Sequence, residues 1–66
     1  MTYNDYHKIA TNKFREYDVG MCNRAIYDCH DTLALFGDTI SDEYAHKIWA
    51  EIDALRERKM VLARQK

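Results

Sequence analysis

Proline is absent from this 66-residue chain, and glycine occurs only twice, at Gly20 and Gly37. Because these two residue types end helices and build turns, their scarcity predicts few turns and long helices. The only cysteines are Cys22 and Cys29, too few for a disulfide framework. On one helix their separation gives a rise of ~10.5 Å, which is beyond the reach of a disulfide. We therefore expect two small buried hydrophobic side chains instead of a redox or metal site.

Long hydrophobic runs are also missing, because no apolar stretch approaches the ~18–20 residues of a membrane-spanning helix. The first residues are polar, so we expect no signal peptide and a cytoplasmic protein without membrane attachment. A chain of this length predicts a single helical domain over residues 1–66. Its 47% hydrophobic and 32% charged residues are typical of a folded protein, not of a disordered one.

Apolar residues recur at helical spacing and predict an all-α fold, a small three-helix bundle with an extended C-terminal helix. The expected helices cover residues 3–18, 21–36 and 42–65. Thr2 and Asp5 form a capping box before the first helix, Gly20 is expected to end it, and Asp18 is placed to cap the second. The face that the first helix turns inward is expected to carry Tyr3, Tyr6, Ala10, Phe14 and Tyr17.

The third helix is the most informative element, because it is longer than the other two. Capped by Thr39 or Ser41, it holds about 24 residues, or ~36 Å, against ~24 Å for each of the others. Its inward stripe contains Ala45, Ile48, Trp49, Ile52 and Leu55. From Arg56 onward five basic residues outnumber one acidic residue, so this end carries +4 and residues 1–55 carry −5 of the net −1. We expect a compact body with a projecting basic arm that frays, meets a second copy or docks a partner.

Reactive side chains do not form a recognisable site in the sequence. The run Asp28-Cys29-His30-Asp31 offers possible ligands, but neighbouring residues on a helix point ~100° apart and do not converge on one ion. Cys29 lies at the centre of an apolar face, where a reactive thiolate is disfavoured. The sequence also has no glycine-rich phosphate loop and no nucleophile elbow. We predict no catalytic residue, no metal, no cofactor and no enzymatic activity.

The stretch TLAL at 32–35, followed after a turn by YAHKIWAEIDALRER at 44–58, resembles small helical proteins encoded by tailed bacteriophages. The resemblance covers about the second half of the chain. It implies an infected bacterial cytoplasm as the setting and carries over no catalytic residue. Small phage proteins of this kind often bind a host protein and divert its activity.

The predicted function is therefore binding and modulation of a host protein through helical surfaces. The residues expected to bind the partner are Trp49, Arg56, Lys59, Met60 and Leu62, with Tyr27 and Leu35 as a second patch. A homo-oligomer is also expected, and a self-assembling structural subunit is one alternative. The other alternative is a nucleic-acid-associated regulator that uses Arg56, Arg58, Lys59, Arg64 and Lys66. Nucleic acid is the less favoured partner, because Asp42 and Glu43 at the start of the third helix would repel phosphate.

Overall fold

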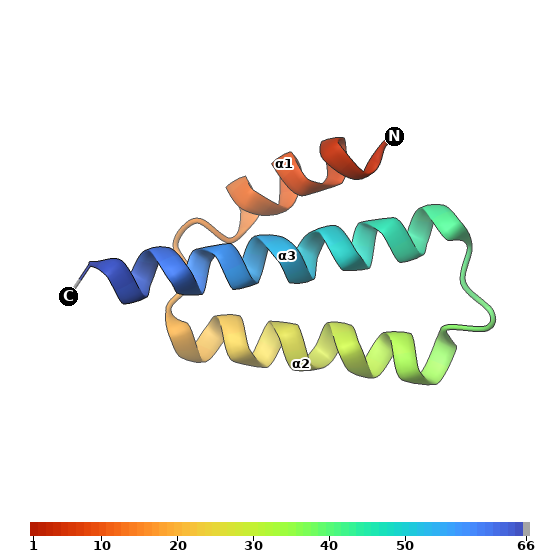
Figure 1. Ribbon diagram of the computed structural model, residues 1–66. Helices are drawn as coiled ribbons and strands as arrows, with labels where there is room; N and C mark the ends of the chain where they lie inside the picture. The colour runs from red at the N-terminus through yellow and green to blue at the C-terminus, as the bar shows by residue number, and fades with distance from the viewer. Residues whose placement is uncertain (66) are drawn as a thin grey trace.

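The computed structural model describes residues 1–65 and consists of three α-helices joined by two short connections (Figure 1). The helices are α1 (Tyr3–Lys13), α2 (Val19–Phe36) and α3 (Asp42–Arg64). α1 and α3 run in the same direction, and α2 runs in the opposite one (Figure 1). The predicted all-α three-helix bundle is confirmed. So is the extended last helix, which has 23 residues against 11 in α1 and 18 in α2.

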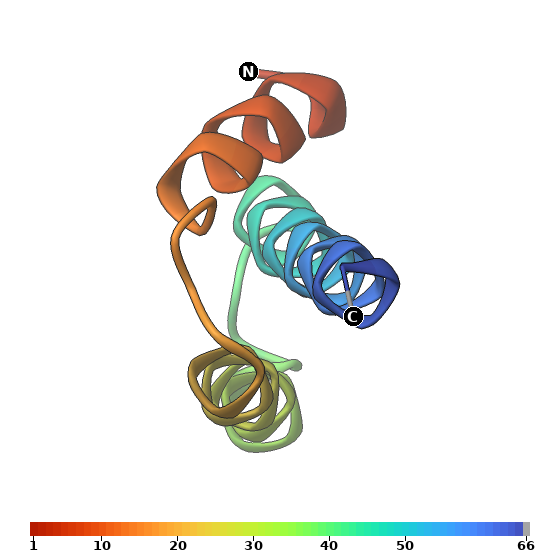
Figure 2. The same cartoon turned by 90° about the vertical axis from the view of Figure 1, so that its left-hand side faces the viewer.

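α3 is the central element of this bundle. α1 and α2 each pack on α3, and within residues 1–65 the backbones of α1 and α2 stay apart from each other (Figure 2). The backbone measures 41 × 23 × 13 Å along its principal axes. Viewed along α3, the three helices form a bent layer in which α1 and α2 cover α3 from two sides (Figure 2).

The start of each helix follows from a capping side chain. Thr2 and Asp5 form the predicted capping box, in which each side chain accepts a hydrogen bond from the other residue's backbone N–H. Asp18 caps α2, with its carboxylate accepting a backbone N–H from three residues further on at 2.8 Å. Ser41, and not Thr39, caps α3 in the same way at 3.1 Å. These contacts satisfy N–H groups that the helix itself leaves without a partner.

The end of the first helix was not predicted correctly. The sequence favours a helix to residue 18, but α1 ends at Lys13. The Phe14 N–H still donates to the Ala10 carbonyl at 2.9 Å, whereas the Tyr17 N–H donates to the Phe14 carbonyl at 3.0 Å, which is a tighter turn. The aromatic spacing continues through this turn and therefore resembles helical spacing in the sequence.

The early end of α1 has a physical reason in the start of α2. Asp18 is extended, at φ −86° and ψ 178°, because only there can its side chain cap the next helix. The chain must also cross from one side of α3 to the other before α2 begins (Figure 2). α2 consequently starts at Val19, two residues earlier than expected, and Gly20 lies in its first turn instead of ending α1.

The core lies where the three helices meet. Its buried cluster consists of Ala10, Phe14, Cys22, Ala54 and Leu55. The predicted inward stripe of α3 is confirmed at its centre, because Ile48, Ile52 and Leu55 are all buried. A second buried row on α3 consists of Ala50 and Ala54. These alanines lie about half a turn of the helix away from Ile52, so one row faces each neighbouring helix.

Candidate protein-binding surface

The C-terminal turns of α3 extend beyond the ends of both neighbouring helices (Figure 1). Their last polar contact with the linker between α1 and α2 is made by Arg58, whose Nε donates to the Tyr17 carbonyl oxygen at 3.0 Å. Val61 is 41% exposed and lies beside Thr11 and Arg15. The projecting part of α3 is therefore shorter than the sequence indicates, because Arg58 and Val61 still lie alongside the first helix and its linker.

Three of the predicted partner-binding residues share one face of α3. Trp49, Arg56 and Met60 lie seven and then four residues apart, which places them within about 40° on a helix. Trp49 is 46% and Met60 55% exposed, and Arg56 is also exposed. Arg56 and Met60 line a shallow depression of about 300 Å³ together with Lys59, which is half-buried. We call Trp49, Arg56, Lys59 and Met60 the α3 surface.

Leu62, the fifth predicted residue on this helix, does not belong to the α3 surface. It is half-buried and points about 200° away from Met60 around the helix. The helical rotation separates it from Trp49, Arg56 and Met60, whereas Lys59, three residues earlier, lies next to it.

Trp49 also joins the α3 surface to α2. The His30 ring meets the Trp49 ring edge-on, with 6.0 Å between ring centroids. Tyr27 precedes His30 by three residues and so lies next to it on the surface of α2. The sequence did not indicate the contact between His30 and Trp49, because these two residues are 19 positions apart and neither spacing nor charge links them.

The predicted second patch lies on the outer side of α2. Tyr27 is 70% and Leu35 67% exposed, and Asp28 and Asp31 between them are exposed as well. These four side chains fall within about 100° on the helix, opposite the fully buried Cys22. We call Tyr27, Asp28, Asp31 and Leu35 the α2 outer face. It combines apolar and acidic groups around the exposed Arg24, which lies on the same face of the helix.

The contact between α1 and α3 is the feature that sequence reasoning missed. Small side chains pack at its centre, where Ala10 of α1 meets the alanine row of α3. Around this centre, side chains of α1 bind carboxylates of α3 in four pairs: Tyr3 with Asp53, Tyr6 with Glu43 at 2.8 Å, His7 with Glu57 at 2.5 Å, and Lys13 with Glu51 at 3.6 Å. The inward stripe is confirmed, and the hydroxyls of Tyr3 and Tyr6 reach acidic partners at the edge of the contact.

Two of these pairs change the acidity of their members. The hydrogen bond that Tyr3 donates to the Asp53 carboxylate raises the pKa of Tyr3 to about 12, with burial and the negative charge acting in the same direction. The hydrogen bond to Glu43 likewise raises the pKa of Tyr6, and it lowers the pKa of Glu43. Both tyrosines therefore stay protonated at neutral pH and act as hydrogen-bond donors.

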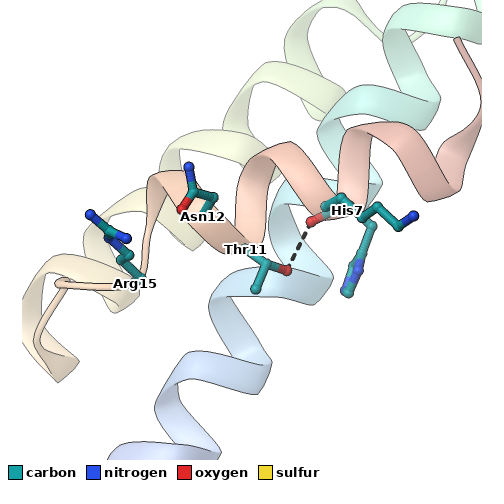
Figure 3. A pocket seen from close by; sticks show the side chains of 5 residues that line it. His7, Thr11, Asn12 and Arg15 are labelled. Atoms are coloured by element: carbon teal, nitrogen blue, oxygen red, sulfur yellow. Dashed lines mark hydrogen bonds between the residues drawn. The ribbon is translucent and has the colours of Figure 1, made fainter.

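Two shallow depressions lie beside Thr11 and Arg15. The larger, of about 470 Å³, is lined by residues of α1 and its linker alone, and the smaller, of about 220 Å³, lies between α1 and the C-terminal half of α3. Figure 3 shows the α1 side, where Thr11 lies between His7 and Arg15 and donates to the His7 carbonyl at 2.8 Å. We call the smaller depression the α1–α3 groove, and its lining residues are Thr11, Arg15, Ala54, Glu57, Arg58 and Val61.

Neither a reactive thiol nor a metal-binding cluster occurs among residues 1–65. Burial raises the pKa of both the Cys22 and the Cys29 thiols, so neither is a thiolate at neutral pH. Within residues 1–65, histidine, cysteine and acidic side chains do not gather in groups of three or more that could hold a metal ion. In the same part of the chain, no helix combines the length and apolar character needed to cross a membrane.

Comparisons with protein-family models, with curated proteins and with solved structures found no match to this chain. The bacteriophage resemblance of the sequence therefore stays a prediction, and function is inferred from the surfaces described above.

Proposed function

We propose that this chain is a non-enzymatic binding protein that engages another protein through the α3 surface. One observation carries the proposal: the longest helix projects past its neighbours and keeps a tryptophan and a methionine exposed beside cationic side chains. Tryptophan, methionine and arginine are enriched at the centres of protein interfaces. Exposed large apolar groups on a small protein are a cost that binding removes.

The proposed partner is a bacterial host protein whose activity is modulated by binding. This part of the proposal rests on the bacteriophage resemblance of residues 32–35 and 44–58 and on the absence of a convergent reactive site within the described residues. The phage setting, the modulation of the host protein and the cytoplasmic location are parts of this proposal. They also define the first experiment, because lysates of candidate host bacteria supply the partners to be tested.

The test compares two double variants of matched chemistry. Arg56→Glu with Met60→Asp changes the α3 surface, whereas Arg15→Glu with Ile9→Asp makes the matching changes on α1 and its linker, where both residues are also exposed. Each tagged variant is used to capture partners from host lysate, and bound proteins are quantified by mass spectrometry. We expect the α3 pair to lower capture of a specific partner at least about tenfold and the α1 pair to leave it unchanged. Equal capture by both would refute the α3 surface as the binding site.

Nucleic-acid binding is the second proposal, and one structural observation bears on it. Lys66 lies outside the described residues, and Arg58 donates its Nε to the Tyr17 carbonyl. Among residues 1–65, Arg56, Lys59 and Arg64 are therefore the members of the predicted set whose side chains make no hydrogen bond or ion pair to the rest of the molecule. Three phosphate contacts would give binding that weakens with salt at a slope of roughly −3 on a double-logarithmic plot. Duplex or RNA binding at low salt with that slope would support it, and no binding at low salt would exclude it.

A further inference from the structure

α1 and α2 cover only part of the circumference of α3. The row of Ala50 and Ala54 faces α1, and the row of Ile48, Ile52 and Leu55 faces α2. These two rows point about 150° apart around the helix, so the wider of the two arcs between them spans about 210°. On that side of the bent layer, α3 meets no other helix of residues 1–65 (Figure 2). A further helix can therefore lie along α3 there without displacing either neighbour.

A row of side chains with heptad spacing runs along the middle of this open arc. Its members are separated alternately by four and by three residues, which is the spacing that lets two helices pack along their length. All of them are exposed except Asp53, which is half-buried. We call this row the α3 outer row, and it consists of Asp42, His46, Trp49, Asp53, Arg56, Met60 and Ala63.

The order of residues in the α3 outer row is complementary to its own reverse. Two copies can be laid antiparallel so that Asp53 of each lies opposite Arg56 of the other. The next step outward is four residues on both chains, and it places Trp49 opposite Met60. Every contact then occurs twice about a two-fold axis. Each carboxylate meets a guanidinium, and each indole meets a thioether, which are favourable pairs.

The charges of this row are not neutralised by ion pairs inside the molecule. The ion pairs among the described residues include neither Asp53 nor Arg56, and Asp53 accepts a hydrogen bond from the uncharged Tyr3 hydroxyl. The acidic Asp42 lies at the start of α3, whereas the basic Arg64 lies at its end. An antiparallel copy of α3 therefore brings unlike charges together along the whole helix.

Other arrangements and other partners match the α3 outer row less well. A parallel pair places Asp53 opposite Asp53 and Arg56 opposite Arg56, so like charges repel each other. An antiparallel pair shifted by one heptad places Trp49 opposite Asp53 and loses both favourable contacts. A nucleic acid or an anionic membrane would meet the carboxylates of Asp42 and Asp53 along the same line. A second copy supplies acidic, apolar and basic groups in the order that the row requires.

We propose that the α3 outer row docks antiparallel against the same row of a second copy of this chain, with Asp53 opposite Arg56. The indole of Trp49 from the second copy falls on the depression lined by Arg56, Lys59 and Met60, where cationic groups lie against its ring. The proposal rests on the proposed function in one respect, because the α3 surface then serves both contacts. The second copy and a host protein therefore compete for this surface.

The test uses the layer in which His46 faces Ala63 of the second copy, three residues beyond the contact of Trp49 with Met60. Both His46 and Ala63 are exposed, and neither belongs to the α3 surface. The basic variant carries His46→Lys and Ala63→Lys, and the acidic variant carries His46→Glu and Ala63→Glu. Self-association of the purified chains is measured by sedimentation velocity over a concentration series, after circular dichroism has verified helical content. Each variant alone places like charges opposite each other twice and should lose at least about tenfold in association constant.

The decisive sample is the equimolar mixture of the basic and the acidic variant. Each lysine then faces a glutamate, so association should return at least to the wild-type level. The control variant carries Asn12→Lys and Gln65→Lys, which make the same change in charge at exposed positions outside the α3 outer row. It should associate like the wild type.

The antiparallel orientation is tested by cross-linking. Chains with His46→Cys and chains with Ala63→Cys are oxidised separately and as a mixture, and disulfide-linked dimers are measured on a non-reducing gel. The two introduced cysteines face each other in the mixture, whereas identical cysteines lie ~25 Å apart along the paired helices. The wild type, with Cys22 buried and Cys29 half-buried, supplies the background. We expect the mixture alone to cross-link above this background, and this result is decisive even if a charged variant loses helical content.

Three results would overturn the proposal. The wild type could stay monomeric at about 1 mM, the weak limit of specific association. The mixture of charged variants could fail to restore what each has lost. One cysteine chain alone could cross-link as readily as the mixture, which would indicate a parallel pair. The basic variant keeps all four residues of the α3 surface, so it should capture at least as much host protein as the wild type. Self-association is measured without a host protein, and each of the two proposals can therefore fail while the other stands.

Discussion

Replacing Leu55 by alanine tests the assignment of the core at its centre. Leu55 has no exposed surface, and it belongs to the cluster in which residues of all three helices meet. Truncation of a fully buried leucine removes its transfer free energy and leaves a cavity, at a total of about 3 kcal/mol. A chain of this length has a total stability of roughly 3–10 kcal/mol. Leu55→Ala is therefore expected to lower the melting temperature by about 12–24 °C. If the total stability is near the lower value of about 3 kcal/mol, a large fraction of the variant is unfolded.

The measurement is urea and thermal unfolding followed by circular dichroism at 222 nm. Leu35→Ala is the matched control, because it makes the same chemical change on a helix at a side chain that is 67% exposed. Leucine and alanine have similar helix propensities, so propensity contributes little to either variant. We expect the control to change the unfolding free energy by no more than about 0.5 kcal/mol. A Leu55→Ala cost below about 1 kcal/mol, or one equal to that of the control, would show that Leu55 is not at the centre of a packed core.

Two further predictions concern the backbone and the α1–α3 contact. Gly37→Ala should destabilise the fold by at least about 1 kcal/mol, because a Cβ there would lie 2.4 Å from the Leu33 carbonyl oxygen. Gly20→Ala should instead stabilise α2 by about 0.4–1 kcal/mol, because the nearest atom to its Cβ would be 3.4 Å away. Denaturant unfolding of both variants measures the difference, and equal effects would contradict it. Because the pKa of Tyr3 is raised from 10.0 to about 12, its contribution to stability is complete below pH 10 and declines as pH rises towards 12. Tyr3→Phe removes the hydroxyl that binds Asp53 and should flatten this part of the stability–pH curve, so an unchanged slope would show that the pair does not form in solution.

The helices of this protein were largely predictable from local signals in the sequence. The capping residues Thr2 and Asp18, each with a side chain that accepts a nearby backbone N–H, mark two helix starts within a few residues. The row Ile48, Ile52 and Leu55 identifies the side of α3 that packs on α2, because large apolar side chains give a clear periodic signal. Local chemistry and one apolar stripe were therefore enough for the all-α bundle.

The contacts between helices were less predictable, for reasons that particular residues make clear. Ala50 and Ala54 form the second buried row of α3, but alanine has a weak hydrophobic signal and is also the residue most favoured in exposed helices. The end of α1 depends on the route of the linker around α3, and no residue near Lys13 marks it. On the α3 surface Met60 is exposed, as a binding residue must be. Trp49, which the sequence also placed in the inward stripe of α3, is 46% exposed, and its contact with His30 arises only from packing.

The central position of α3 has a consequence for the order in which the molecule is made. α1 and α2 leave the ribosome before α3, and each of them packs on α3 and not on the other. Most of the stability of a helix in a protein comes from packing and not from helix propensity. Residues 1–40 are therefore expected to stay largely unstructured until α3 has been synthesised.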